Sequence, residues 1–203
     1  MVSKEQLKRP KQMENLTREY HLGQIRALEE EERTVELSFS SEEPYSRWFG
    51  AEILDHSEGC VDLKRLKDVG CVLFNHGRDK VVAGIVDAWR GEGRCKAKVR
   101  FDKDEESDAI YQKVLSGTLK GVSVGYRVDT WEEVPAGKWS KDGRFAGPCS
   151  IAKSWWPFEI SIVSVPADPT VGVGRSMEKG RTLDWYARQL QTNKNKFRRR
   201  MEA

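Results

Sequence analysis

The alternation of apolar and polar residues along the chain predicts a mainly β protein. Val35, Leu37 and Phe39 alternate with polar residues, which is typical of a half-buried strand. Strands are predicted, in chain order, at residues 35–39, 71–75, 80–89, 95–101, 121–130 and 158–165. The glycines of the turn at 91–93 connect two of these segments and therefore predict a hairpin.

A change of period predicts one helix between these strands. Acidic residues open the segment 104–117, Ile110, Val114 and Leu115 share one of its faces, and Gly117 closes it. Negative charge is favourable at a helix N-terminus, and glycine commonly follows the last turn. We therefore expect a helix over this segment.

Turn-forming residues predict a long loop before the last strand. Residues 132–150 contain two prolines and three glycines. Together the elements predict a mainly β fold with helices, of the α+β class. We expect a partly open antiparallel β-barrel with peripheral helices, because closing a sheet removes its exposed edges.

The distribution of charge divides the chain into three parts. Of the 203 residues, 33% are charged and 38% are apolar, and the net charge is +3. The residues from 175 onward hold nine Lys and Arg but three acids, which gives this end about +6. We expect a polar N-terminal segment at 1–33, a β domain at 34–175 and a basic tail or helix at 176–203.

Composition also limits the classes of function. A net charge of +3 is too small for a generic nucleic-acid binder. No apolar run approaches the roughly 18 residues of a membrane span, and the N-terminus lacks the apolar stretch of a secretory signal. We therefore expect a soluble protein that stays in the cytoplasm of the cell that makes it.

The cysteines and histidines lack the spacing of metal ligands. Cys60, Cys71, Cys95 and Cys149 form no CxxC pair, and His21, His56 and His76 fall in no HExxH motif. Reduced, buried or half-buried thiols are the simpler interpretation. We expect neither a metal nor a cofactor.

Three polar residues interrupt apolar strands. His76 follows the apolar run at 71–75, and Glu159 lies between Phe158 and Ile160, where a carboxylate is costly unless it is paired. Ser123 lies within a strand. Its same-face neighbours, Gly121 and Gly125, leave room for another chain to approach the hydroxyl. Each also has an ordinary structural interpretation: a strand serine, a turn-capping histidine and a solvent-facing glutamate.

Three short blocks of sequence resemble one protein family. Residues 74–77 (FNHG), 117–126 (GTLKGVSVGY) and 158–169 (FEISIVSVPADP) resemble, in this order, the blocks of the prohead (capsid-maturation) proteases of tailed bacteriophages. The resemblance covers about residues 33–175. That family is distantly similar to herpesvirus assemblin, a serine protease on a partly open β-barrel, so the resemblance implies an assemblin-like fold.

The resemblance also implies a catalytic role for each of the three residues. Ser123 matches the nucleophile, His76 the general base, and Glu159 the third member, which orients the imidazole. Herpesvirus proteases carry an arginine-rich turn after the third residue, whereas here the turn is Pro166-Ala167-Asp168-Pro169. The oxyanion donors are therefore not identified, although a backbone N–H after Val165 would suffice.

Other features have weaker functional interpretations. His21 and His56 are alternative bases, but His56 is expected in a solvated surface turn. The Trp155-Trp156-Pro157 cluster is expected to pack at the barrel rim rather than to line a groove. The loop at 137–150 could form a flap. The basic C-terminal segment is either a solvated tail or a docking element for an acidic scaffold.

The sequence therefore predicts a serine endopeptidase that cleaves scaffold and capsid precursor proteins, and also itself, during prohead maturation. The alternative is a non-catalytic capsid assembly or scaffolding protein on the same fold. The expected partners are the major capsid protein with its scaffold segment and further copies of the chain, as in a dimer. We expect no direct nucleic-acid role and no membrane. The expected location is the host cytoplasm, inside the assembling prohead.

Overall fold

The computed structural model describes residues 16–21, 26–29, 32–47, 50–91 and 93–164. All of them belong to the first of the two units into which the chain divides, Met1–Val171. The Pro166–Pro169 turn and the basic segment 176–203 lie outside the described residues, so the predictions made for them stay predictions.

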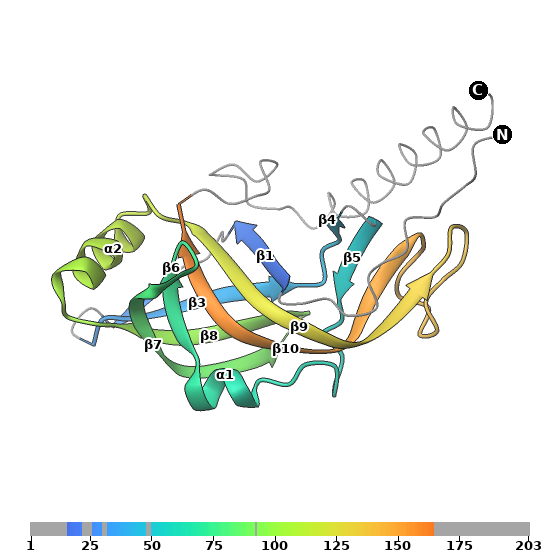
Figure 1. Cartoon of the computed structure of the whole chain (residues 1–203), viewed down its shortest axis with the longest axis horizontal. Coiled ribbons are helices and arrows are strands. Elements are labelled where there is room, and N and C mark those ends of the chain that lie inside the picture. The colour runs from blue at the N-terminus through green and yellow to red at the C-terminus, as the bar shows by residue number, and fades with distance from the viewer. Residues whose placement is uncertain (1–15, 22–25, 30–31, 48–49, 92, 165–203) are drawn as a thin grey trace, which may run out of the picture. The chain divides into compact units, whose positions relative to one another are not determined.

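Within the described residues, the fold consists of one ten-stranded sheet and two short helices (Figure 1). The strands are β1 (Leu16–His21), β2 (Arg26–Glu29), β3 (Thr34–Ser41), β4 (Tyr45–Arg47), β5 (Gly50–Leu54), β6 (Cys71–Phe74), β7 (Gly77–Gly91), β8 (Arg94–Phe101), β9 (Gly121–Val134) and β10 (Cys149–Val163). The helices are α1 (Lys64–Val69) and α2 (Glu105–Leu115). The prediction of a mainly β fold with helices is confirmed.

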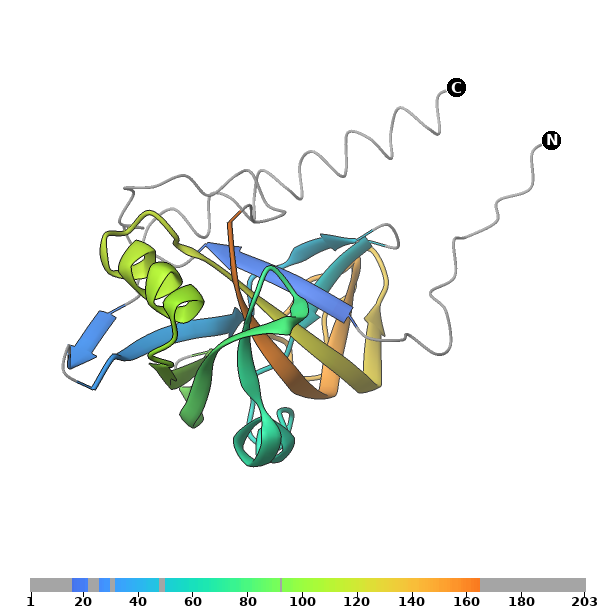
Figure 2. The ribbon, with the colours of Figure 1, turned by 60° about the vertical axis from the view of Figure 1, so that its left-hand side comes forward.

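The sheet is curled and open, and it is mixed rather than purely antiparallel. Its strand order is β1-β9-β10-β6-β7-β8-β3-β2, with β5 paired to β10 and β4 paired to β5. Figure 2 shows that the sheet is strongly curved. Strand β10 runs parallel to both β5 and β6, while the other strand pairs are antiparallel. The polar N-terminal segment supplies β1 and β2, the two ends of this order.

Local signals located the β7–β8 hairpin and helix α2 correctly. The Asp104 carboxylate accepts a hydrogen bond from Ser107 N at 3.0 Å and so caps the first turn of α2. Gly117 follows the helix with a φ of +71°, a conformation that glycine adopts without strain.

The long loop and the last strand differ from their predicted bounds. Strand β9 continues to Val134 and β10 begins at Cys149, so the loop covers only 135–148. The two strands remain paired over this whole length because bulges absorb the irregular positions, one of them next to Pro157. Proline and glycine therefore mark the turn but not the limits of the strands.

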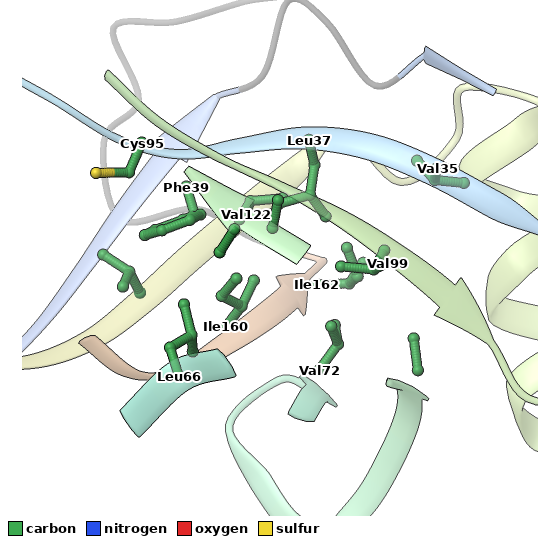
Figure 3. Packing of buried hydrophobic residues seen from close by; sticks show 14 of the residues in the cluster. Val35, Leu37, Phe39, Leu66, Val72, Cys95, Val99, Val122, Ile160 and Ile162 are labelled. Carbon is green, nitrogen blue, oxygen red and sulfur yellow. The ribbon is translucent and has the colours of Figure 1, made fainter. Parts of the chain in front are cut away.

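The core lies on the concave face of the sheet (Figure 3). It joins apolar residues of the sheet and of α1, including Val35, Leu37, Phe39, Leu66, Val72, Cys95, Val99, Val122, Ile160 and Ile162. Strand β3 is buried on both faces rather than on one, because Thr34 and Ser38, which lie opposite Arg100 and Lys96 of β8, are covered as well.

Candidate functional site

A tight turn between β6 and β7 positions His76. Asn75 and His76 have φ angles of +50° and +59°, and Phe74 pairs with Gly77 across them. Two consecutive positive φ values are the requirement of the tight hairpin turn, and asparagine tolerates them well. The Asn75 side chain also accepts a hydrogen bond from Ser164 N at 2.9 Å, which fixes the turn to the end of β10.

The imidazole of this turn contacts β10. His76 Nδ1 lies 2.5 Å from Glu159 Oε1 and 3.3 Å from Ser161 Oγ. The Glu159 side chain is 13% exposed, so it faces the imidazole rather than open solvent. Burial, and then the Glu159 charge, raises the pKa of the neighbouring Cys71 thiol. Glu159 therefore has the paired environment that a carboxylate in this strand requires.

Ser123 lies on β9, directly opposite Ser161 of β10. It is completely buried, and its hydroxyl donates a hydrogen bond to the carbonyl oxygen of Arg18 on β1 at 3.2 Å. A serine hydroxyl has one hydrogen to donate. In this arrangement that hydrogen holds β1 and is not directed to an imidazole.

The glycines beside Ser123 accommodate β10. A Cβ on Gly125 would lie 2.5 Å from Glu159 Cγ, and one on Gly121 would lie 2.6 Å from the Val163 carbonyl oxygen. The space predicted on this face is therefore occupied by the adjacent strand. The segment that approaches the Ser123 hydroxyl is β1 of the same chain.

A buried polar cluster around His56 was missed, and the prediction of a solvated His56 is wrong. His56 is 2% exposed, its Nδ1 lies 2.8 Å from the Leu54 carbonyl oxygen, and its Nε2 lies 2.7 Å from Ser40 Oγ. The ring also packs edge-on against Trp155. Burial lowers the pKa of His56 to about 4, and the hydrogen bond to Leu54 offsets only part of this effect. His56 is thus neutral at pH 7.

Asp55 joins this cluster to the loop between β9 and β10. Its carboxylate is completely buried and pairs with Lys153 and, at 2.5 Å, with Arg144 Nη2. Burial alone would raise the pKa of Asp55. Hydrogen bonds from Lys153, Ser57 and Arg144 outweigh it and hold the pKa well below its ordinary value. One signal was available in the sequence: Asp55 and His56 are the first two residues after an apolar strand end, and His76 is likewise the second residue after one.

A second buried cluster surrounds Glu52. Arg47 Nε lies 3.3 Å from Glu52 Oε2, Arg18 Nη1 lies 3.8 Å from Glu52 Oε1, and the Tyr126 hydroxyl donates to the same carboxylate. Burial, and then the Glu52 charge, raises the pKa of Tyr126 well above its ordinary value. These contacts connect β1, β4, β5 and β9. The cluster is therefore suited to holding strands together.

Trp155 and the four cysteines, which the sequence analysis also singled out, are buried or half-buried parts of the fold. Trp155 is 1% exposed and donates from Nε1 to the Asp55 carbonyl oxygen at 2.9 Å, so it belongs to the core rather than to the rim. Cys60, Cys95 and Cys149 are buried and Cys71 is half-buried, all as free thiols, as expected.

Two further searches concern the described part of the chain. It contains no group of three or more His, Cys, Asp or Glu side chains placed to hold a metal ion. None of its helices has the length and hydrophobicity needed to cross a bilayer.

Comparisons with known proteins find capsid proteins of phages. The chain is 40% identical over 147 residues to a major capsid protein of Halomonas phage phiHAP-1, which covers 70% of this chain and 23% of that protein. It is 25% identical over 160 residues to a capsid polyprotein of Pseudomonas phage PAJU2, covering 74% of this chain and 21% of that protein. The chain thus spans less than a quarter of the length of either relative. No family model matches the chain, and no solved structure matches it.

These names correct the main functional prediction. Both relatives are named as capsid proteins, which contradicts the prediction of a prohead serine endopeptidase and supports the alternative of a structural capsid role. The three blocks of sequence misled for a physical reason. They specify a tight turn and two paired strands, and these elements account for the contact between His76 and Glu159 without showing an activity.

Proposed function

We propose that this chain is a non-catalytic structural part of a phage capsid, acting in the assembly of the shell. The observation that carries the proposal is the 147-residue match, at 40% identity, to a major capsid protein. The proposed partners are capsid protein copies and a scaffold segment, and the proposed location is the phage particle. The finer fold prediction, an assemblin-like barrel, is also kept as a proposal, which an experimental structure would test by its strand order.

The arrangement around Ser123 agrees with a structural role. Its hydroxyl is buried and holds the carbonyl oxygen of Arg18, so it links β9 to β1. The contact between His76 and Glu159 links the β6–β7 turn to β10. In this proposal the three residues tie neighbouring strands of the sheet together.

The test is to co-express the chain with its capsid protein and to analyse purified particles by sedimentation and intact mass. We expect the chain to be a stoichiometric component of the particles. The mass of the capsid protein should be the same with wild type and with Ser123→Ala, and the two forms of the chain should differ only by the oxygen atom that the substitution removes. Particles that lack the chain, or a capsid cleavage that disappears in Ser123→Ala, would refute the proposal.

A further inference from the structure

One strand carries a row of basic side chains on the outer face of the sheet. In β8, Cys95, Ala97, Val99 and Phe101 point into the core and are at most 2% exposed. The alternating residues Arg94, Lys96, Lys98 and Arg100 point to the opposite face and are exposed or half-buried. We call these four residues the β8 basic row. Because alternate residues of a strand lie about 7 Å apart, the row is about 20 Å long.

The carboxylates next to this row are already paired. Glu36 of β3 lies opposite Lys98 and forms its ion pair with Lys96 at 3.1 Å. Asp87 of β7 also lies opposite Lys98, and it is paired with Lys67 of α1 at 2.9 Å.

The other three cations of the row have no such partner. Arg94, Lys98 and Arg100 form no ion pair within the described part of the chain. The outer face of β8 therefore keeps an excess of positive charge that the net charge of +3 does not reveal.

An aromatic side chain accompanies the row. Trp89 of β7 lies directly opposite Lys96, so both side chains are on the same face, and Trp89 is half-buried. Val86, in the bulge of β7, is 49% exposed. A charged track with an adjacent aromatic ring is the combination by which proteins bind nucleic-acid strands without reading their sequence.

We propose that the β8 basic row binds the phosphate backbone of a nucleic acid. The row offers evenly spaced cations on a sheet face, and that arrangement matches a repeating charge rather than the individual side chains of a protein partner. Backbone contacts of this kind are independent of sequence and weaken as salt increases. The inference goes beyond the capsid role and stands on the geometry of β7 and β8 alone.

The test measures fluorescence anisotropy of a labelled 20-nucleotide DNA, single-stranded and duplex, with the full chain at several salt concentrations. Lys98→Gln/Arg100→Gln removes two cations of the row. Lys113→Gln/Lys138→Gln removes two exposed cations elsewhere and is the matched control. The basic segment 176–203 is present in every variant, so any binding by this segment contributes equally to all of them.

We expect the β8 variant to bind about 10-fold more weakly or worse, with the slope of log K against log salt reduced in magnitude by about two. The control variant should stay within about 3-fold of wild type on the same scale. Glu36→Gln, which removes the carboxylate paired with Lys96, should strengthen binding.

Three results would overturn the proposal. They are equal losses in the two double variants, no measurable DNA binding by wild type at low salt, and tighter binding of polyglutamate than of DNA at equal charge. The last result would identify the surface as a site for acidic protein segments. Circular dichroism and melting temperature should be the same for all variants, because the substituted side chains lie at the surface.

Discussion

Ser40 donates its hydroxyl hydrogen to Nε2 of His56, 2.7 Å away, inside the core. The direction follows from the other ring nitrogen. Nδ1 lies 2.8 Å from the Leu54 carbonyl oxygen, which can only accept, so Nδ1 carries the proton. Because the pKa of His56 is lowered to about 4, the ring is neutral and Nε2 is free to accept from Ser40. A polar pair is thus satisfied where water is excluded.

The lowered pKa of His56 should make the stability of the protein depend on pH. The unfolded chain binds a proton at His56 near pH 6.5 and the folded chain only near pH 4. Between these values the unfolded state therefore holds more protons, and the free energy of unfolding decreases as pH decreases. The loss should reach about 3 kcal/mol at pH 4. Urea unfolding at pH 7, 5.5 and 4 measures this loss, and the pH dependence of the free energy of unfolding should become flatter in His56→Gln. An unchanged slope in that variant would contradict the assignment.

The ion pairs of Asp55 with Arg144 and Lys153 should stabilise the loop at 135–148. In Asp55→Asn, Arg144 and Lys153 lose their buried partner, which should lower the free energy of unfolding by about 2–4 kcal/mol. Trypsin should then cleave faster after Lys138 and Lys141, because Arg144 loses its buried partner and keeps only its ion pairs with Glu42 and, within the loop, Asp142. Asp129→Asn, at an exposed position of β9, is the control and should change neither quantity. Equal trypsin cleavage of the two variants would show that Asp55 does not hold the loop.

The close approach of β10 to Gly125 leaves no space for a larger side chain at this position of β9. An alanine Cβ would meet Glu159 Cγ at 2.5 Å and the Phe158 ring at 2.7 Å, so Gly125→Ala should destabilise the protein by about 1–3 kcal/mol. The matched change is Gly84→Ala, where a Cβ meets nothing within 4 Å and the melting temperature should stay the same or increase. Equal melting temperatures for wild type and Gly125→Ala would show that β10 moves away at little cost.

The hydrogen bond from Ser123 to the Arg18 carbonyl oxygen should stabilise the pairing of β1 with β9. Ser123→Ala removes the hydrogen bond to the Arg18 carbonyl oxygen and should cost about 1 kcal/mol. Hydrogen exchange should show lower protection of the β1 amides in this variant, with β10 unchanged. Ser46→Ala, on the exposed side of β4, serves as the reference and should have no effect. Full protection of β1 in Ser123→Ala would exclude the linking role.

The elements that could be predicted from the sequence are those determined by near neighbours. The β7–β8 hairpin follows from its turn, and α2 follows from Asp104 at its start and Gly117 after its end. The pairing of Glu159 could also be predicted, because a carboxylate in an apolar strand needs a partner.

The features that could not be predicted depend on distant partners. Strands β1 and β2 have polar sequences without a strand pattern, and they are strands because they pair with β9 and β3. His56 lies in a segment that has the composition of a surface turn, and its burial depends on Ser40 and Trp155, which lie in other strands. The function could not be predicted from these blocks either, since a contact between a histidine and a glutamate also serves to hold a turn to a strand.

The pairing of β10 has a consequence for how the chain folds during synthesis. Residues 149–152 pair with 51–54, residues 160–162 pair with 72–74, and β9 lies along the other side of β10. The ribosome therefore releases β5 and β6 long before β10, the strand with which both of them pair, exists. Pairings so distant in sequence are slow to form, and open strand edges attract other chains meanwhile. Translation speed and chaperone supply around residues 149–163 should therefore control the yield of folded protein more strongly than changes elsewhere in the sheet.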